Sequence, residues 1–462
     1  MLKVLESCRV SPPPQSKAEK SLPLTFFDLI WVPFHPLARV IFFDIPCSTN
    51  HYFQNILPNL KTPLSDALQH FYPLAGNLIK PLNTNSEIDF HIRYVDGDSV
   101  LVTFAECTGD FNHFSGYHAR DANLFKPLVP QLPTGGTCVL ASGEQCSASP
   151  LLAIQVTFFP NHGVCIGFTN SHVVADGSSL FSFIQAWASL CKQVMLKVDG
   201  SNFQIPYYDR SSIKDPVGLG ATFKSNLVGS VTAEQMEHNV PDQSADDTKA
   251  RVTFILKQPH IEALKSLVIQ KRPALPYISS FTAVCAYIWT CMAKTRAAVV
   301  KNMEQESLNF GIAYDCRARL DPPLPASYFG NCILAAVTVE KKNILAGEEG
   351  LFAAAELIGK SLYAKLNNKE GILKGSGDFN EFAGVLRGEW YLGVAGSPKL
   401  DYYNTIDFGW GKPTKFEFVS EPFSISRCKD SKVGLELGFI MPKNEVDVFS
   451  SIFAQGLTAG ST

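Results

Sequence analysis

A histidine and an aspartate with three residues between them are the pair in this chain best suited to acid–base chemistry. His172 and Asp176 follow an apolar run at 164–168 and precede residues 180–187, whose apolar residues recur at helical spacing. The run predicts a buried strand, and the spacing predicts an amphipathic helix. Neutral imidazole, with an ordinary pKa of about 6.5, can accept a proton from a bound hydroxyl near neutral pH.

The same spacing occurs a second time, which shows how little it means alone. His238 and Asp242 lie in a polar stretch that contains a proline and follows no strand-like run, so we expect a solvated loop there. A hydrogen-bonded core histidine is the alternative interpretation of His172. Its apolar context, together with a second motif far downstream, favours the catalytic interpretation.

The elements around His172 indicate how it would be positioned. Residues 151–159 and 164–170 are strand-like and flank a turn at 160–163, which predicts a hairpin that leads directly to His172. Ser178 or Ser179 is the expected N-cap of the following helix.

Length and composition favour a globular protein of two domains. The chain has 462 residues, of which 46% are hydrophobic and 18% charged, and its formal net charge is −3. This charge favours neither a nucleic acid nor a membrane surface as a partner, so local basic groups would have to bind any anionic ligand. We expect small-molecule substrates and a monomer.

Cysteine usage and hydropathy bear on compartment. The twelve cysteines form no C-x-x-C pair and no metal-like cluster, the first residues do not form a signal peptide, and no segment is long enough to span a membrane. Reduced thiols and a cytoplasmic location are therefore expected, with no metal.

Strands and helices mix throughout, which predicts an α/β protein. We place an N-terminal domain at 1–200, a crossover loop rich in proline and glycine at 201–249, and a C-terminal domain at 250–462.

A second motif lies far downstream, at Asp407, Phe408, Gly409, Trp410 and Gly411. It predicts a tight loop, packed by its aromatic residues and tied by Asp407. His-x-x-x-Asp followed by Asp-Phe-Gly-Trp-Gly resembles the plant BAHD acyl-CoA-dependent acyltransferases over the whole chain. The segments at 22–28, 328–332 and 395–400 resemble the subgroup that acylates glycosylated anthocyanins, flavonoids and other phenolics.

This resemblance implies two similar domains, each like chloramphenicol acetyltransferase, with an active-site channel at their interface. Acyl-CoA would enter from one face and the acceptor from the other, and no permanently bound cofactor is implied. His172 would be the general base for direct transfer of the acyl group. The chain contains no G-x-S-x-G elbow that would indicate a serine nucleophile.

The resemblance also assigns supporting roles. Asp176 would pair with Arg317, facing away from the acceptor pocket, and so hold the loop of His172. Asp407 is grouped with His172 because activity should depend on it, although its loop is expected to act through structure. Residues expected near the CoA are Ser279, Ser280, Ser397 and Lys399. Ser397 or backbone N–H groups could stabilise the oxyanion.

The acyl donor remains open between two classes. The motif at 328–332 resembles that of malonyl-CoA users, but no cation follows Asp176 to bind a malonyl carboxylate. Hydroxycinnamoyl-CoA is therefore the alternative donor. A non-catalytic paralogue that binds phenolics and a serine hydrolase are the alternatives to a transferase.

Overall fold

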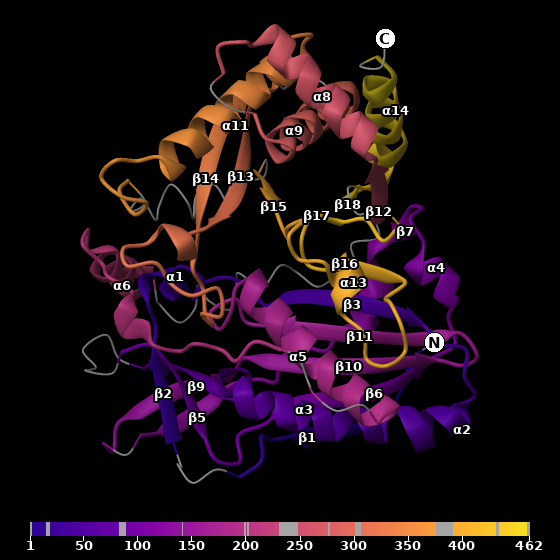
Figure 1. Ribbon diagram of the computed structural model, residues 1–462, viewed down its shortest axis with the longest axis vertical. Helices are drawn as coiled ribbons and strands as arrows, with labels where there is room; N and C mark the ends of the chain where they lie inside the picture. Colours follow the sequence, from indigo (N-terminus) through magenta and orange to yellow (C-terminus); the bar gives the residue numbers. More distant parts are fainter. Residues whose placement is uncertain are drawn as a thin grey trace.

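The protein is described by a computed structural model that covers residues 2–14, 19–82, 89–140, 142–197, 200, 203–230, 248–275, 278–300, 306–375, 391–430 and 434–459. His238 and Asp242 lie outside the described residues. Most N-terminal elements occupy the lower part of Figure 1 and most C-terminal elements the upper part. Each part combines sheets with helices, as expected for an α/β protein.

Two sheets organise the N-terminal part. The six-stranded sheet contains, in spatial order, β1 (Leu2–Val10), β6 (Val100–Cys107), β10 (Leu152–Phe159), β11 (Gly163–Asn170), β3 (Leu37–Asp44) and β16 (Lys415–Phe418). The five-stranded sheet contains β2 (Glu19–Pro23), β5 (His91–Val95), β4 (Asn77–Pro81), β9 (Gln145–Pro150) and β8 (Gly136–Val139).

The hairpin predicted before His172 is confirmed. β10 and β11 pair antiparallel from Leu152 opposite Asn170 to Phe159 opposite Gly163. Every residue of both strands is buried, because separate apolar clusters cover the two faces of the sheet. Helix α5 (Gly177–Leu196) follows and packs against α3 (Pro58–His70). The end of β11 thus delivers His172 to the edge of the sheet.

The C-terminal part has two further sheets. One contains β17 (Phe423–Arg427), β18 (Leu435–Pro442), β12 (Lys249–Leu256) and β7 (Arg120–Asp121), and the other β14 (Ile333–Lys341), β13 (Ser307–Asp315) and β15 (Tyr391–Val394). A bridge between Ala395 and Ser424 joins them. The covering helices are α8 (Gln258–Lys271), α9 (Ser280–Val299), α10 (Lys342–Ala346), α11 (Gly350–Leu366) and α14 (Lys443–Ala459) (Figure 1).

The remaining elements are short. They are α1 (Phe26–Leu29), α2 (Thr49–His51), η1 (Tyr52–Ile56), η2 (Tyr72–Leu74), α4 (Phe111–Ser115), η3 (Ala122–Leu128), η4 (Arg210–Ser212), α6 (Leu219–Ser230), η5 (Arg317–Arg319) and α13 (Tyr402–Thr405). Helix α6 lies within the segment expected to be a crossover loop, so that segment is not loop throughout. Across the described stretches, the helices are all too short or too polar to cross a membrane.

The two parts exchange strands. β16 pairs with β3 in the N-terminal sheet, and β7 pairs with β12 in the C-terminal sheet. A buried ionic cluster joins the exchanged strands, in which Glu417 of β16 contacts Arg120 at 2.7 Å and Arg251 at 3.2 Å. The boundaries at 200 and 250 remain predictions, and the hydrogen-bonded sheets cross them.

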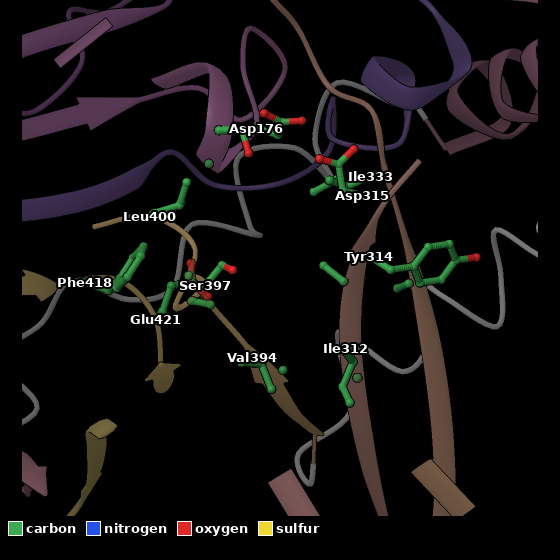
Figure 2. Close-up of a pocket in the computed structure, with 18 of the residues that line it drawn as sticks. Asp176, Ile312, Tyr314, Asp315, Ile333, Val394, Ser397, Leu400, Phe418 and Glu421 are labelled. Atoms are coloured by element: carbon green, nitrogen blue, oxygen red, sulfur yellow. The ribbon is translucent and has the colours of Figure 1, made fainter. Parts of the chain in front are cut away.

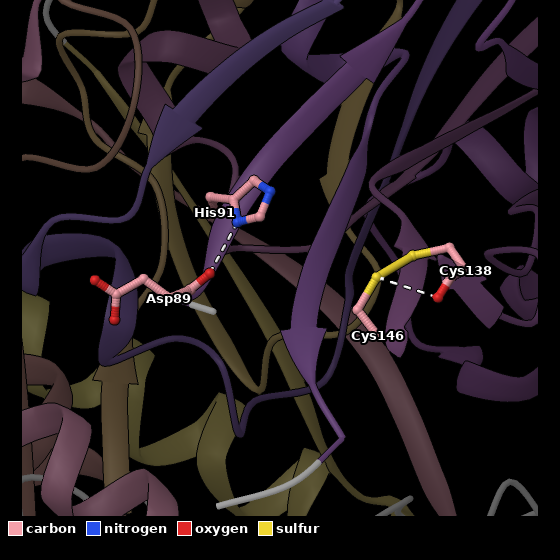
Figure 3. Close-up of a disulfide and its surroundings, with 4 residues drawn as sticks. All are labelled: Asp89, His91, Cys138 and Cys146. Carbon is pink, nitrogen blue, oxygen red and sulfur yellow. Dashed lines mark hydrogen bonds between the residues drawn. A yellow bond between two sulfur atoms is a disulfide. The ribbon is translucent and has the colours of Figure 1, made fainter. Parts of the chain in front are cut away.

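The expectation that all thiols are reduced is wrong for one pair. Cys138 of β8 and Cys146 of β9 are opposite each other in adjacent strands and are joined by a disulfide (Figure 3). Adjacent antiparallel strands bring Cα atoms within bridging distance, here 5.3 Å. The pairing was not foreseen because the loop between the strands gives no indication of it. The ten other cysteines are free.

Candidate active site

A cavity of about 1050 Å³ lies between the two parts of the molecule, as the expected channel requires. His172 and Asp176 border it from the N-terminal part. Strands β13 and β15 border it from the C-terminal part, where Ile312 and Val394 lie side by side as register partners in the two paired strands (Figure 2). The cavity is large enough for a drug-sized ligand.

His172 is held in the cavity wall by an aromatic ring. The Trp31 ring stacks on the imidazole with 3.7 Å between centroids and 11° between planes. Burial is the main cause that lowers the pKa of His172, to about 4, although the nearby Asp176 carboxylate acts in the opposite direction. The imidazole is therefore neutral at pH 7, which is the state a general base needs.

Asn331 selects the tautomer of this imidazole. Its side-chain oxygen lies 3.0 Å from Nδ1 of His172. Its Nδ2 lies 2.9 Å from the backbone oxygen of His172 and 3.0 Å from Oδ1 of Asp28, so the amide nitrogen is assigned from its acceptors. Because the Asn331 oxygen can only accept, Nδ1 of His172 must carry the proton, and Nε2 keeps the lone pair.

A second layer holds Asn331 in place. Asp28 is fully buried and accepts hydrogen bonds from Asn331, from the backbone of Thr25 and from Arg210. Gly330 adopts φ +140°, and a Cβ there would lie 2.8 Å from Nη2 of Arg210. A chain of buried contacts therefore runs from Arg210 in the crossover segment to His172.

Sequence reasoning missed these supporting residues. Asn331 and Asp28 lie in segments that were recognised only by their resemblance to a subgroup, and no sequence pattern pointed to Arg210. Asp28 lies 182 positions from Arg210 and 303 positions from Asn331, and no local pattern predicts such contacts. Trp31 is likewise remote from His172 in sequence.

Asp176 caps helix α5 and forms the predicted ion pair. Its Oδ1 accepts from the backbone N–H of Ser179 at 3.0 Å, so the expectation of a serine N-cap is wrong. Its Oδ2 lies 2.8 Å from Nη2 of Arg317 and accepts from the backbone of Cys332. Both charged side chains are buried. Asp176 also borders the cavity (Figure 2), and its orientation relative to the acceptor pocket stays a prediction.

Asp407 is absent from the cavity wall in the described part of the chain and ties a loop to α5. Its Oδ1 accepts from the backbones of Gly409 and Gly411, both at 2.9 Å, and its Oδ2 accepts from Lys192 of α5 at 2.7 Å. Burial alone would raise the pKa of Asp407, but these bonds lower it below the ordinary value. Trp410 contacts Met195 of the same helix. The loop therefore braces the helix that Asp176 caps.

Replacing Asp407 by alanine should lower the melting temperature and activity together. The loss of hydrogen bonds to a charged acceptor is typically worth about 1.5–3 kcal/mol each, and here two backbone N–H groups lose their partner. Asp407→Asn keeps an acceptor for them and should be milder, while Lys192→Met, which removes only a half-exposed ion pair, should be mildest. An Asp407→Ala protein that is inactive at wild-type stability would contradict this role.

Three of the four residues expected near CoA border the cavity. Ser280, Ser397 and Lys399 border it, and the Lys399 side chain is exposed. Ser279 is the N-cap of α9, where its hydroxyl accepts from the backbone of Thr282 at 2.9 Å. These four residues stay predictions for CoA binding.

Comparison with known proteins decides the family. A family profile described as the Transferase family matches residues 1–451. The chain belongs to the BAHD acyltransferase family. This BAHD chain is 43% identical to phenolic glucoside malonyltransferase 1 of Nicotiana tabacum, over 91% of this chain and 90% of that one. It is 39% identical to the malonyl-coenzyme A:anthocyanin 3-O-glucoside-6''-O-malonyltransferase of Dahlia pinnata, over 99% and 97%.

Other comparisons extend to a different acyl group and to solved structures. The BAHD chain is 33% identical, over 100% of its length and 98% of the relative, to a coumaroyl-CoA:anthocyanidin 3-O-glucoside-6''-O-coumaroyltransferase 1 of Arabidopsis thaliana. Its fold is similar to that of vinorine synthase, with a TM-score of 0.67 and 20% identity over 97% and 96% of the two chains. It is also similar to F. sporotrichioides TRI101, with a TM-score of 0.63 and 15% identity over 92% and 96%. The predicted BAHD family and its two-domain fold are confirmed.

Proposed function

We propose that this BAHD acyltransferase moves a malonyl group from malonyl-CoA to a sugar hydroxyl of a phenolic or flavonoid glucoside, anthocyanins included. The observation that carries the chemistry is the hydrogen bond between Nδ1 of His172 and Asn331, because it leaves Nε2 as a base in the wall of the cavity. The substrate class rests on relatives named as glucoside malonyltransferases at 43% and 39% identity.

The proposed reaction is a direct transfer. Nε2 of His172 takes the proton of the acceptor hydroxyl while its oxygen attacks the thioester carbonyl. The tetrahedral intermediate carries the negative charge on the former carbonyl oxygen, towards which the Ser397 hydroxyl is the proposed donor. The carbon–sulfur bond then breaks, and the CoA thiolate recovers the proton from the imidazolium. Asn331 holds the ring, and Asp176 with Arg317 holds its loop.

A panel of acyl donors and acceptors tests this proposal. Malonyl-CoA, acetyl-CoA and coumaroyl-CoA would each be offered with phenolic and flavonoid glucosides, while free CoA and the acylated product are measured. We expect CoA release that requires the glucoside and a product heavier by one malonyl group. A strong preference for coumaroyl-CoA would favour the alternative donor, hydrolysis without acceptor would favour a hydrolase, and no turnover would favour a binding protein.

The lowered pKa of His172 predicts the pH dependence of kcat/KM. The histidine must be neutral to act, and its pKa of about 4 keeps it neutral at pH values where an ordinary histidine is already protonated. The acid limb due to His172 should therefore lie near pH 4, and not near the ordinary value of about 6.5. Trp31→Ala admits water to the ring and should move the limb upwards. A wild-type limb at the ordinary value, unmoved in Trp31→Ala, would contradict this, provided that circular dichroism shows folded protein at each pH.

A further inference from the structure

An arginine in the middle of an apolar strand borders the cavity near His172. Arg39 belongs to β3, where it pairs with Phe168 of β11 and with Phe418 of β16. It is only 3% exposed, and its guanidinium carbon lies 5.6 Å from the centre of the Phe418 ring. It borders the same cavity as His172. Burying a charge in such a strand costs free energy unless a partner compensates it, so an arginine kept there suggests a function.

The protein does not neutralise this charge by direct contact. Nε and Nη1 of Arg39 are buried and have no hydrogen-bond partner in the described structure, although the Tyr402 hydroxyl is near enough to act on the guanidinium. Glu421 acts on Arg39 electrostatically, but the two do not form an ion pair within 4.0 Å. Burial lowers the pKa of Arg39, yet an arginine in a protein keeps its proton at neutral pH. The wall of the cavity thus holds a positive charge that no carboxylate of the described residues contacts directly.

The charge acts at the catalytic centre. Arg39 contributes to the lowered pKa of His172, so the imidazole lies within its field. Two other permanent cations border the cavity in the described part of the chain, Arg319 and Lys399, and the side chains of both are exposed. Their exposure suits phosphate groups at a solvated entrance, whereas Arg39 is buried in the wall that also holds His172.

We propose that Arg39 determines donor specificity by binding the free carboxylate of a dicarboxylic acyl-CoA such as malonyl-CoA. This inference rests on the proposed function and supplies the cation that is missing after Asp176. A guanidinium binds carboxylates strongly, and Arg39 has unpaired donors that could bind one. An uncharged acyl group would leave these donors unpaired, so the arrangement also disfavours hydroxycinnamoyl donors.

Glu421 opposes this binding. It borders the cavity on the side of Phe418 and Ser397 (Figure 2), and burial raises its pKa, which Arg39 partly offsets. Its carboxylate therefore competes with a bound acyl carboxylate for the charge of Arg39. Removing the charge of Glu421 should strengthen the preference for a dicarboxylic donor.

The test compares malonyl-CoA with acetyl-CoA, which has the same thioester without the carboxylate, on one phenolic glucoside. Arg39→Met keeps the length and the packing on Phe418 but loses the charge. The ratio of the two kcat/KM values, malonyl over acetyl, should fall about 10–100-fold, as the loss of a charged hydrogen bond implies. Glu421→Gln should raise the ratio. Lys399→Met is the matched control and should leave the ratio unchanged, since both donors carry the same CoA.

The outcomes separate this inference from the function on which it rests. If wild-type enzyme uses malonyl-CoA but Arg39→Met slows both donors equally, Arg39 serves the oxyanion or the fold, and the inference is overturned. If wild-type enzyme uses acetyl-CoA and rejects malonyl-CoA, the proposed donor fails as well. Should Arg39→Met not fold, Glu421→Gln decides alone, and an unchanged or lowered ratio overturns the inference.

Discussion

Replacing His172 by alanine should lower kcat by about 10²–10⁴-fold, the range that general-base catalysis contributes. The imidazole supplies the base in the proposed transfer. The Trp31 ring and the Asn331 amide hold it in the cavity wall. The fold should persist, because His172 is only partly buried and is not part of the hydrophobic core clusters. The measurement is CoA release with saturating donor and acceptor, alongside thermal unfolding.

Two comparisons make this result interpretable. His238→Ala removes the histidine of the second His-x-x-x-Asp match and should leave kcat near the wild-type value. Asn331→Ala keeps His172 but frees Nδ1 to exchange tautomers, so kcat should fall less than in His172→Ala. Near-normal turnover of His172→Ala, or a collapse of activity in His238→Ala, would reverse the assignment of the base.

Breaking the buried ion pair of Asp176 and Arg317 should cost about 3–5 kcal/mol of unfolding free energy, because the remaining charge stays buried without its partner. The Nη2 atom of Arg317 contacts Asp176 at 2.8 Å and also lies 3.2 Å from the hydroxyl of Ser179. Asp176→Asn and Arg317→Met should each destabilise the protein and lower activity. Chemical unfolding with activity measured in parallel gives both quantities.

The double variant tests whether the two residues act as a pair. Since each single change leaves one buried charge, Asp176→Asn with Arg317→Met should lose less stability than the sum of the two single changes. Arg319→Met is a matched control on the same short helix with an exposed side chain, and it should cost little. Additive losses in the double variant would show that the two side chains do not act as a pair.

The parts of the fold that sequence predicted are those with local signals. The strand and helix around His172 were found because buried strands are continuously apolar and the helix repeats its apolar residues. The start of the helix was predicted less accurately. Asp176, not a serine, caps α5, because residues 177–179 already belong to the helix. The exchange of β16 and β7 between the two parts could not be predicted, since four-residue and two-residue strands carry almost no pattern.

The residues of the site also differ in whether the sequence could predict them. His172, Asp176 and Arg317 were recognised from motifs, and the structure brings the latter two together. Asn331, Asp28 and Arg210 became visible only through contacts made in the folded chain. Arg39 is a different case, because a cation inside the apolar run of β3 is a signal that the sequence does carry. Arg39 is buried and lines the same cavity as His172, which is why we propose a role for it in donor binding.

Direct transfer by His172 is tested most directly by a single-turnover experiment with the enzyme in excess over malonyl-CoA. With a phenolic glucoside present, free CoA and malonylated glucoside should appear together with one rate constant, and His172→Ala should slow both equally. Without the glucoside, no burst of CoA should appear, and intact-mass analysis should find unmodified protein. A burst of CoA in the absence of acceptor, together with protein heavier by one malonyl group, would contradict direct transfer and point to an acyl-enzyme.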